Sequence, residues 1–235
     1  MLNKIIDGRT DLVFEFLHQG NSVDAIDSDG ISLIQWCAYY GDVSAIRLLM
    51  SKGARLETLG DNLDLTGAAF HGHWQLTQFL IEQGADASMP SSDNGETALH
   101  AACTAASRPA YQYIVEILLA NGADPNWPTI PGMETGMFMR DATTHGETPL
   151  HRAAAFGGPE LITMLLNAGA KVESRDVHGE TPLAWASWHQ RPASVLKLLC
   201  YGDHHISDSH VSLYTRDHGM GWGGLEKSLR GKPHL

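Results

Sequence analysis

Cysteine, uninterrupted apolar runs and positive charge are all scarce in this 235-residue sequence. Its three cysteines, Cys37, Cys103 and Cys200, are an odd and widely spaced set, which argues against a disulfide framework and favours a reducing compartment. No apolar stretch approaches the ~20 residues that a membrane-spanning helix needs. The first residues also lack the apolar core of a signal peptide. We therefore expect a cytoplasmic protein that does not associate with membranes.

Negative charge dominates the composition. The sequence has 16 lysines and arginines against 27 aspartates and glutamates, for a formal net charge of -11. Such a surface repels a phosphate backbone, and no basic run interrupts it, so nucleic acid is excluded as an expected partner. Hydrophobic residues make up 43% of the chain, which is the level of a folded protein rather than a disordered one.

What the sequence does contain is an internal repeat. The segment Gly95-Glu96-Thr97-Ala98-Leu99-His100 returns with proline in the fourth place at residues 146–151, and again at residues 179–184, where Ala184 also replaces the histidine. A weaker copy occupies residues 30–35. Apolar runs that end in Gly-Ala also recur, at residues 53–54, 84–85, 122–123 and 169–170, and Gly146 and Gly179 lie 33 residues apart.

One unit of the repeat reads as a pair of helices. Thr148 is placed to cap the first helix, and Pro149 then occupies the first helical position, where its missing N–H costs nothing. Ala153 and the alanine after it let a neighbouring helix come close. We expect Gly157 to end the first helix in the left-handed conformation, and residues 161–166 to form the apolar core of the second. A single pair cannot bury its apolar face, so copies must stack.

This pattern resembles the ankyrin-repeat family, over roughly the first 200 residues. The resemblance implies an all-α solenoid of about six helix-pair repeats with short β-hairpin fingers, here residues 1–202. We divide it into a truncated first repeat that ends at about residue 26, followed by repeats two to six at residues 27–59, 60–93, 94–144, 145–177 and 178–202. It also implies a non-enzymatic scaffold that binds a protein or peptide partner along its concave groove and fingers. Residues 203–235 fit no further repeat; they are too apolar for a free tail, so they either cap the last repeat or fold into the groove as an internal ligand. We expect a monomer.

The fourth repeat carries two insertions. Extra residues lie in its helix–helix turn near residues 107–110, and a longer insertion occupies its finger at residues 127–144. The long insertion is unlike a flexible linker, because it is rich in methionine and aromatic residues and has few charges. It either packs onto repeats four and five or contacts the partner directly. Its candidate binding residues are Trp127, Met133, Met137, Phe138 and Met139.

Aromatic residues recur at matched positions of the repeats. In the family's fold, the two residues before the turn that ends the first helix point into the groove, and the residue after the histidine position faces the same side. Rings at such positions are typical of interface hot spots. The alternative is that some of them cover the contacts between repeats. The candidates are Trp36, Tyr39, Tyr40, Phe70, His71, Arg152, Phe156, Trp185, Trp188 and His189.

The thirteen histidines do not indicate a metal site. His100 and His151 follow a capping threonine by three positions, where a side chain can reach back to the helix start. His145 and His178 should face solvent on fingers. A dense set at residues 204–218 matches no sharp zinc pattern. We expect neither a metal nor a cofactor.

No strong catalytic motif appears either, which favours the scaffold. An alternative stays open: an enzyme or small-molecule binder whose site is formed by the repeat-four insertion and the C-terminal extension lying over the groove. A deep closed pocket beneath the insertion would favour that alternative, and an open concave surface would favour the scaffold.

Overall fold

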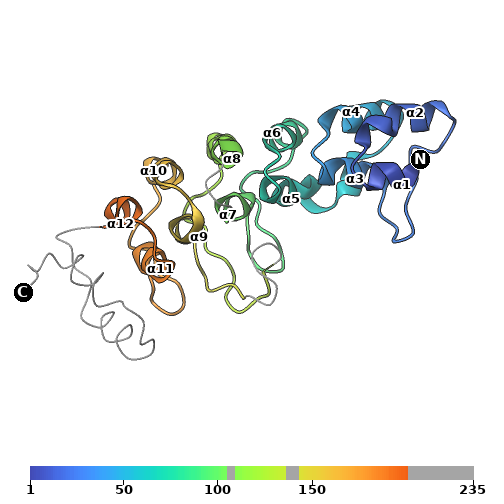
Figure 1. The fold of residues 1–235 in the computed structure, drawn as a ribbon. Coiled ribbons are helices and arrows are strands. Elements are labelled where there is room, and N and C mark those ends of the chain that lie inside the picture. The colour runs from blue at the N-terminus through green and yellow to red at the C-terminus, as the bar shows by residue number, and fades with distance from the viewer. Residues whose placement is uncertain (105–108, 136–142, 201–235) are drawn as a thin grey trace, which may run out of the picture.

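The computed structural model describes residues 1–104, 109–135 and 143–200. In this part of the chain the helices form two parallel rows (Figure 1). The inner row, from which the fingers hang, consists of α1 (Leu2–Ile6), α3 (Leu33–Tyr39), α5 (Leu65–Phe70), α7 (Ala98–Cys103), α9 (Pro149–Phe156) and α11 (Pro182–Trp188). The outer row consists of α2 (Val13–His18), α4 (Val43–Ser51), α6 (Trp74–Glu82), α8 (Pro109–Ala120), α10 (Pro159–Asn167) and α12 (Ala193–Leu199). Short 3₁₀ turns occupy Thr10–Leu12, Leu56–Leu59 and Asp61–Asp64.

The inner helices begin at the capping residues that the repeat predicts. Ser32 starts α3 in a capping box with Gln35, and Thr97 starts α7 in a capping box with His100. Pro149 and Pro182 occupy the first positions of α9 and α11. Each box satisfies N–H groups that a helix start leaves without a partner.

Repeat three starts differently, because its motif is degraded. Asp64 caps α5 instead of threonine, and its Oδ1 accepts from the Gly67 N–H at 3.1 Å. Asn62, Leu63 and Asp64 all have left-handed backbone, with φ of 50°, 55° and 53°. This conformation costs roughly 1–2 kcal/mol for a residue with a Cβ, so it marks repeat three as locally strained.

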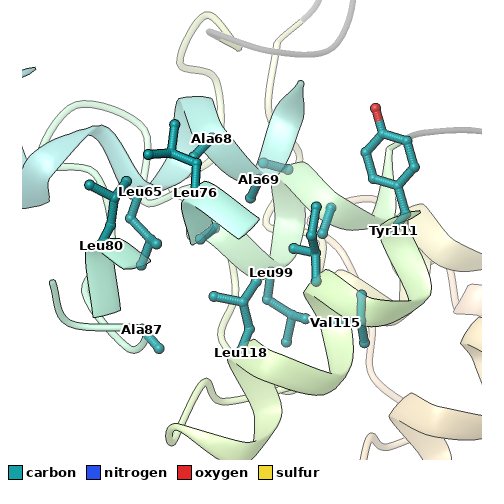
Figure 2. Close-up of a cluster of buried hydrophobic side chains, with 14 of the residues drawn as sticks. Leu65, Ala68, Ala69, Leu76, Leu80, Ala87, Leu99, Tyr111, Val115 and Leu118 are labelled. Atoms are coloured by element: carbon teal, nitrogen blue, oxygen red, sulfur yellow. The ribbon is translucent and has the colours of Figure 1, made fainter. Parts of the chain in front are cut away.

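The core lies between the two rows and runs the length of the array. Figure 2 shows the part shared by repeats three and four, where Leu65 and Leu99 from the inner row meet Leu80 and Leu118 from the outer row. The small residues Ala68 and Ala69 are buried on α5, as Ala101 and its neighbours are on α7, so the inner helices approach closely. Cys37 and Cys103 take the same small-residue positions and are fully buried, as expected of core residues.

The fingers differ from the expected β-hairpins. In the described residues they contain only isolated bridges, Ile26 with Ser32 and Glu134 with Thr143. The reason is local: Asp27 Oδ1 accepts from the N–H groups of Asp29 and Ile31, each at 2.9 Å. Asp176 binds the corresponding N–H groups two and four residues on. A carboxylate thus takes donors that a strand ladder would use.

The predicted left-handed backbone of Gly157, at the end of α9, was also wrong. Its backbone is extended, with φ -77° and ψ 169°, rather than left-handed. Gly158 precedes Pro159 and is held extended in the same way, which favours an open connection. A Cβ on Gly157 would lie 2.8 Å from the Ala153 carbonyl oxygen, so close approach, not a positive φ, requires glycine here. Gly41 and Gly72, after α3 and α5, do have positive φ.

Three predictions fall outside the described residues. These are the binding roles of Met137, Phe138 and Met139, the cap or internal ligand at residues 203–235, and the histidines at residues 204–218. The domain boundary at residue 202 likewise stays a prediction.

Candidate partner-binding surface

Aromatic side chains of repeats two and three surround a depression on the inner row of helices, with a volume of about 600 Å³. Tyr39 is 52% exposed and meets three rings edge-on: Trp36 at 5.8 Å, Tyr40 at 5.1 Å and His71 at 5.0 Å between centroids. The Trp36 indole N–H donates to Asp27 Oδ2 at 2.9 Å, which ties the ring to the finger. The structure therefore brings four of the predicted site residues together.

His71 is an exposed member of this group. Loss of solvation lowers the pKa of His71, and nearby His73 lowers it further. The His71 ring is therefore neutral at pH 7 and offers an apolar face beside Tyr39. Phe70, by contrast, is half-buried and packs against the core, so it supports the surface from below.

Tyr40 mainly contacts the first repeat rather than the groove. Its hydroxyl donates to the Ile6 carbonyl at 2.7 Å, and its ring lies against Gly8, where a Cβ would come within 3.3 Å. Its side chain is 37% exposed. The alternative considered from the sequence, a ring covering the contact between repeats, thus describes Tyr40.

The same kind of contact recurs at the next two turns. His73 Nε2 lies 2.9 Å from the Tyr39 carbonyl oxygen, and its ring covers Gly41. The Tyr111 hydroxyl donates to the Phe70 carbonyl at 2.9 Å, and its ring covers Gly72. We call these three contacts, made by Tyr40, His73 and Tyr111, the turn latches. Sequence reasoning missed them, because each joins a side chain of one repeat to a carbonyl of the preceding one.

A second aromatic group lies at the other end of the array. The rings of Phe156 and His189 are 4.7 Å apart, edge to face. The Trp188 indole N–H donates to Glu180 Oε1 at 3.1 Å, and that of Trp185 donates to Asp176 Oδ2 at 3.0 Å. Trp185 therefore repeats the Trp36–Asp27 arrangement. Four of the five predicted residues of repeats five and six, namely Phe156, Trp185, Trp188 and His189, thus lie at this end of the inner row.

The predicted position of Arg152 was wrong. It was predicted to face the groove, yet its side chain is 1% exposed. Its guanidinium pairs with Glu96 Oε1 and Glu147 Oε1, each at 2.5 Å, and those side chains are 1% and 3% exposed. The tryptophans at the equivalent positions bind a fingertip aspartate, but repeat five has Thr143 in that place. Arg152 instead pairs with the glutamates at the base of the finger, so it cannot contact a partner.

The cluster of Arg152, Glu96 and Glu147 also fixes the base of the repeat-four insertion. The Thr129 hydroxyl donates to Glu147 Oε2 at 2.7 Å, and the same oxygen accepts from the His145 N–H at 2.7 Å. Burial acts to raise the pKa of Glu147, but Arg152 and these two hydrogen bonds outweigh it and lower it to about 2. Glu147 therefore remains ionised.

The described part of the insertion combines buried polar groups with exposed apolar ones. Thr129 and Thr144 are buried, and Gly132 N–H donates to the Thr144 carbonyl at 2.7 Å. Trp127 and Met133 are 40% and 41% exposed. The base of the insertion thus packs onto its own repeats, while these two predicted binding residues face solvent.

His100 and His151 have the structural role expected of them. Each Nδ1 accepts from the N–H of its capping threonine, at 3.2 and 3.1 Å, so the proton resides on Nε2. Nε2 then donates to a carbonyl of the next repeat: Glu147 for His100 and Glu180 for His151. Burial lowers the pKa of both, to about 3 for His100. Each neutral ring bridges two repeats.

The finger histidines are placed differently. His178 is exposed and His145 is half-buried, with their rings 5.0 Å apart. Among the residues that the structure describes, no three histidine, cysteine, aspartate or glutamate side chains gather as metal ligands would. The longest described helix, α8, has 12 residues, and no helix in the described ranges combines the length and apolarity that crossing a bilayer requires.

Comparison of the sequence with known proteins finds relatives that match most of this chain. Over 69% of its length the chain is 25% identical to putative palmitoyltransferase ZDHHC13 of Danio rerio and 29% identical to palmitoyltransferase ZDHHC13 of Homo sapiens. It spans only 28% and 29% of those proteins, so their named activity does not transfer to it. It is also 32% identical, over 64% of its length, to putative ankyrin repeat protein FPV031 of fowlpox virus, of which it spans 40%.

A family model described as ankyrin repeats, three copies, matches residues 65–129 and 132–208, which is more than half of the chain. This match confirms the resemblance inferred from the spaced Gly-Glu-Thr motifs. Repeats of this kind generally mediate protein–protein interaction, and the described helices form the expected stack of pairs. The chain therefore belongs to the ankyrin-repeat family.

Proposed function

We propose that the chain is a binding scaffold that holds a protein or peptide partner along its inner row of helices. The observation that carries the proposal is the exposure of Tyr39 within a packed group of rings. Aromatic anchors beside a depression are the groups that dominate binding energy at protein interfaces. Such rings cost little conformational entropy to immobilise, because they are already fixed by their neighbours.

Two contact regions take part in this proposal. The N-terminal group consists of Trp36, Tyr39 and His71, and the C-terminal group consists of Phe156, Trp185, Trp188 and His189. The exposed rims of both groups lie on the inner row, so an extended partner can span them. Trp127 and Met133 of the insertion add exposed apolar surface near repeat four. A relative 28% identical over 70% of this chain is named as a subunit of target of rapamycin complex 2, which agrees with a scaffold role.

The proposal is tested with two matched pairs of substitutions. Tyr39→Ala with His189→Ala removes exposed rings from the inner row. Trp74→Ala with Tyr113→Ala removes exposed rings from the outer row, where the two are 5.8 Å apart. Each full-length variant is used to capture partners from an extract of the source cells, and the captured proteins are quantified by mass spectrometry.

We expect the inner pair to lose a defined partner at least tenfold, and the outer pair to retain it. Thermal unfolding of both variants controls for damage to the fold, since exposed rings contribute little to the core. Equal losses from both pairs, or retention by the inner pair, would contradict the proposed surface.

A further inference from the structure

The depression of the N-terminal group combines aromatic faces with carboxylates. Trp36, Tyr39 and His71 line one part of it, and the exposed carboxylates of Asp7 and Asp64 line another. Ala38 and Leu59 supply an apolar floor. None of the residues that line this depression is a lysine or arginine. A ring face and a carboxylate attract the same kind of group, a cation.

The surroundings carry the same sign of charge. Between Arg55 and Arg108 the sequence has no lysine or arginine, yet it has seven aspartates and glutamates. A second depression, of about 720 Å³, adjoins the first and shares Leu59 and Asp64 with it. Its lining adds Asp61, Asp93 and Glu134 to the carboxylates, again without a basic residue. The field over repeats two to four is therefore negative.

The three arginines of the first two repeats are engaged elsewhere. Arg9 pairs with Asp11 at 2.7 Å, and Arg55 lies 3.7 Å from Glu57. Arg47 stacks over the Phe79 ring, 4.5 Å from its centroid, between outer-row helices α4 and α6. None of these three lines either depression. A cation to balance Asp7 and Asp64 must then come from outside these residues.

We propose that this depression binds a lysine or arginine side chain of the protein partner. The cationic head lies against the faces of Trp36 and Tyr39, within reach of Asp7 and Asp64, and the aliphatic stem covers the apolar floor. Long basic side chains suit such a site, because their stem is apolar and their head is charged. This inference rests on the proposed scaffold function and adds the chemistry of one anchor residue.

The test begins with a random library of 12-residue peptides displayed on phage, panned against the full-length chain. Enriched peptides are synthesised with a fluorescent label, and their affinity is measured by fluorescence polarisation. Each is compared with a form in which its basic residue is glutamine. We expect a lysine or arginine at one fixed position of the enriched peptides, and at least a tenfold loss of affinity when it becomes glutamine.

Protein variants then locate the anchor. Asp7→Asn with Asp64→Asn removes both charges, and asparagine retains the capping oxygen and tolerates the left-handed backbone at position 64. Tyr39→Ala removes the exposed ring. Glu82→Gln with Glu173→Gln removes two exposed charges that line neither depression and is the control for net charge. We expect the first two variants to weaken the peptide tenfold or more and the control to weaken it less than twofold.

The outcomes separate this inference from the scaffold proposal. Enriched peptides without a basic residue that still lose affinity on Tyr39→Ala would overturn the cationic anchor and leave the binding surface intact. If the control and the Asp7/Asp64 variant lose affinity equally, the peptide is attracted by the net charge of the chain. That result would also overturn the cationic anchor. Failure to enrich any peptide would contradict the cationic anchor alone, because the capture experiment tests the scaffold function separately.

Discussion

Arg152 and Glu96 form a 2.5 Å ion pair with both side chains 1% exposed, although they lie 56 residues apart and belong to successive repeats. Glu147 completes the cluster, because its Oε1 accepts from Nε and from the same Nη2 of Arg152. Removing three charges from water is expensive, and their mutual attraction has to offset that cost. The pairing thus makes the contact between repeats four and five depend on all three residues at once.

Arg152→Ala is expected to destabilise the chain by about 3–5 kcal/mol, because it leaves Glu96 and Glu147 buried without their cation. The triple variant Arg152→Met, Glu96→Gln, Glu147→Gln should recover most of that loss, since no unpaired charge remains. Urea denaturation of both variants measures the difference. If Arg152→Ala lowers the free energy of unfolding by less than about 1 kcal/mol, Glu96 and Glu147 must become hydrated in the variant.

Acid should weaken the array before its carboxylates titrate. His100 and His151 have an ordinary pKa near 6.5, and burial lowers it in the folded chain, to about 3 for His100. Between those values the unfolded chain binds protons that the folded chain does not, so stability falls as the pH falls below 6.5. The slope approaches about 1.4 kcal/mol per pH unit for His100, and His151 adds to it in the same direction. Thermal unfolding from pH 7 to 4.5 checks it.

The control for this prediction comes from the chain itself. Gln35 occupies in repeat two the position of His100 and forms the same kind of capping box. His100→Gln with His151→Gln should therefore fold and show a flatter pH profile above 4.5, whereas His178→Gln, on an exposed finger, should leave the profile unchanged. An unaltered profile in the double variant would mean that other groups set the acid response.

The turn latches predict unequal effects of alanine at two glycines of similar φ. Gly41 and Gly30 have φ of 72° and 82°, so both substitutions carry the strain of left-handed backbone. A Cβ at Gly41 would lie 2.6 Å from the His73 ring, whereas one at Gly30 meets nothing within 4 Å. We expect Gly41→Ala to cost about 1–3 kcal/mol more than Gly30→Ala, as overpacking does.

Chemical denaturation of the two glycine variants measures this difference. Repeating the pair in a His73→Ala background should shrink the gap, because the obstructing ring is gone. A gap that persists there would place the cost in the backbone rather than in the latch.

Tyr111→Phe tests the latch hydrogen bond without disturbing the packing. It removes the hydroxyl that donates to the Phe70 carbonyl, and we expect a loss of about 1 kcal/mol in the free energy of unfolding. Tyr113→Phe, two residues along the same helix on an exposed ring, should cost less than about 0.5 kcal/mol. Similar losses of unfolding free energy in the two variants would show that the Tyr111 hydrogen bond does not stabilise the chain.

Much of the fold follows from the sequence because the deciding interactions are local. A capping threonine, a proline at the first helical position and leucines at helical spacing act within one repeat, and all occur where the motif predicts. The left-handed turn expected of Gly157 was wrong because the following Gly158-Pro159 sets that connection. In the described ranges the fingers that precede α3 and α11 lack hairpin ladders because Asp27 and Asp176 accept from their N–H groups.

The candidate surface could be predicted only in outline. Matched positions identified the rings, but their partners lie in other repeats, so the latch role of Tyr40 and the burial of Arg152 were not visible. Arg152 shares its position with Trp36 and Trp185, and only the finger opposite it decides whether the side chain faces solvent. Trp74 and Tyr113 were missed because the motif marks the inner row alone.

The histidine bridges are distributed unevenly along the array. His100 and His151 accept a proton only by giving up the N–H of a capping threonine, and both join repeats four to six. At the junction of repeats two and three, His73 also bonds a carbonyl through Nε2, but no capping threonine binds its ring. Since each repeat contacts only its neighbours, protonation of these two rings loosens the junctions of repeats four to six and makes that part of the array flexible.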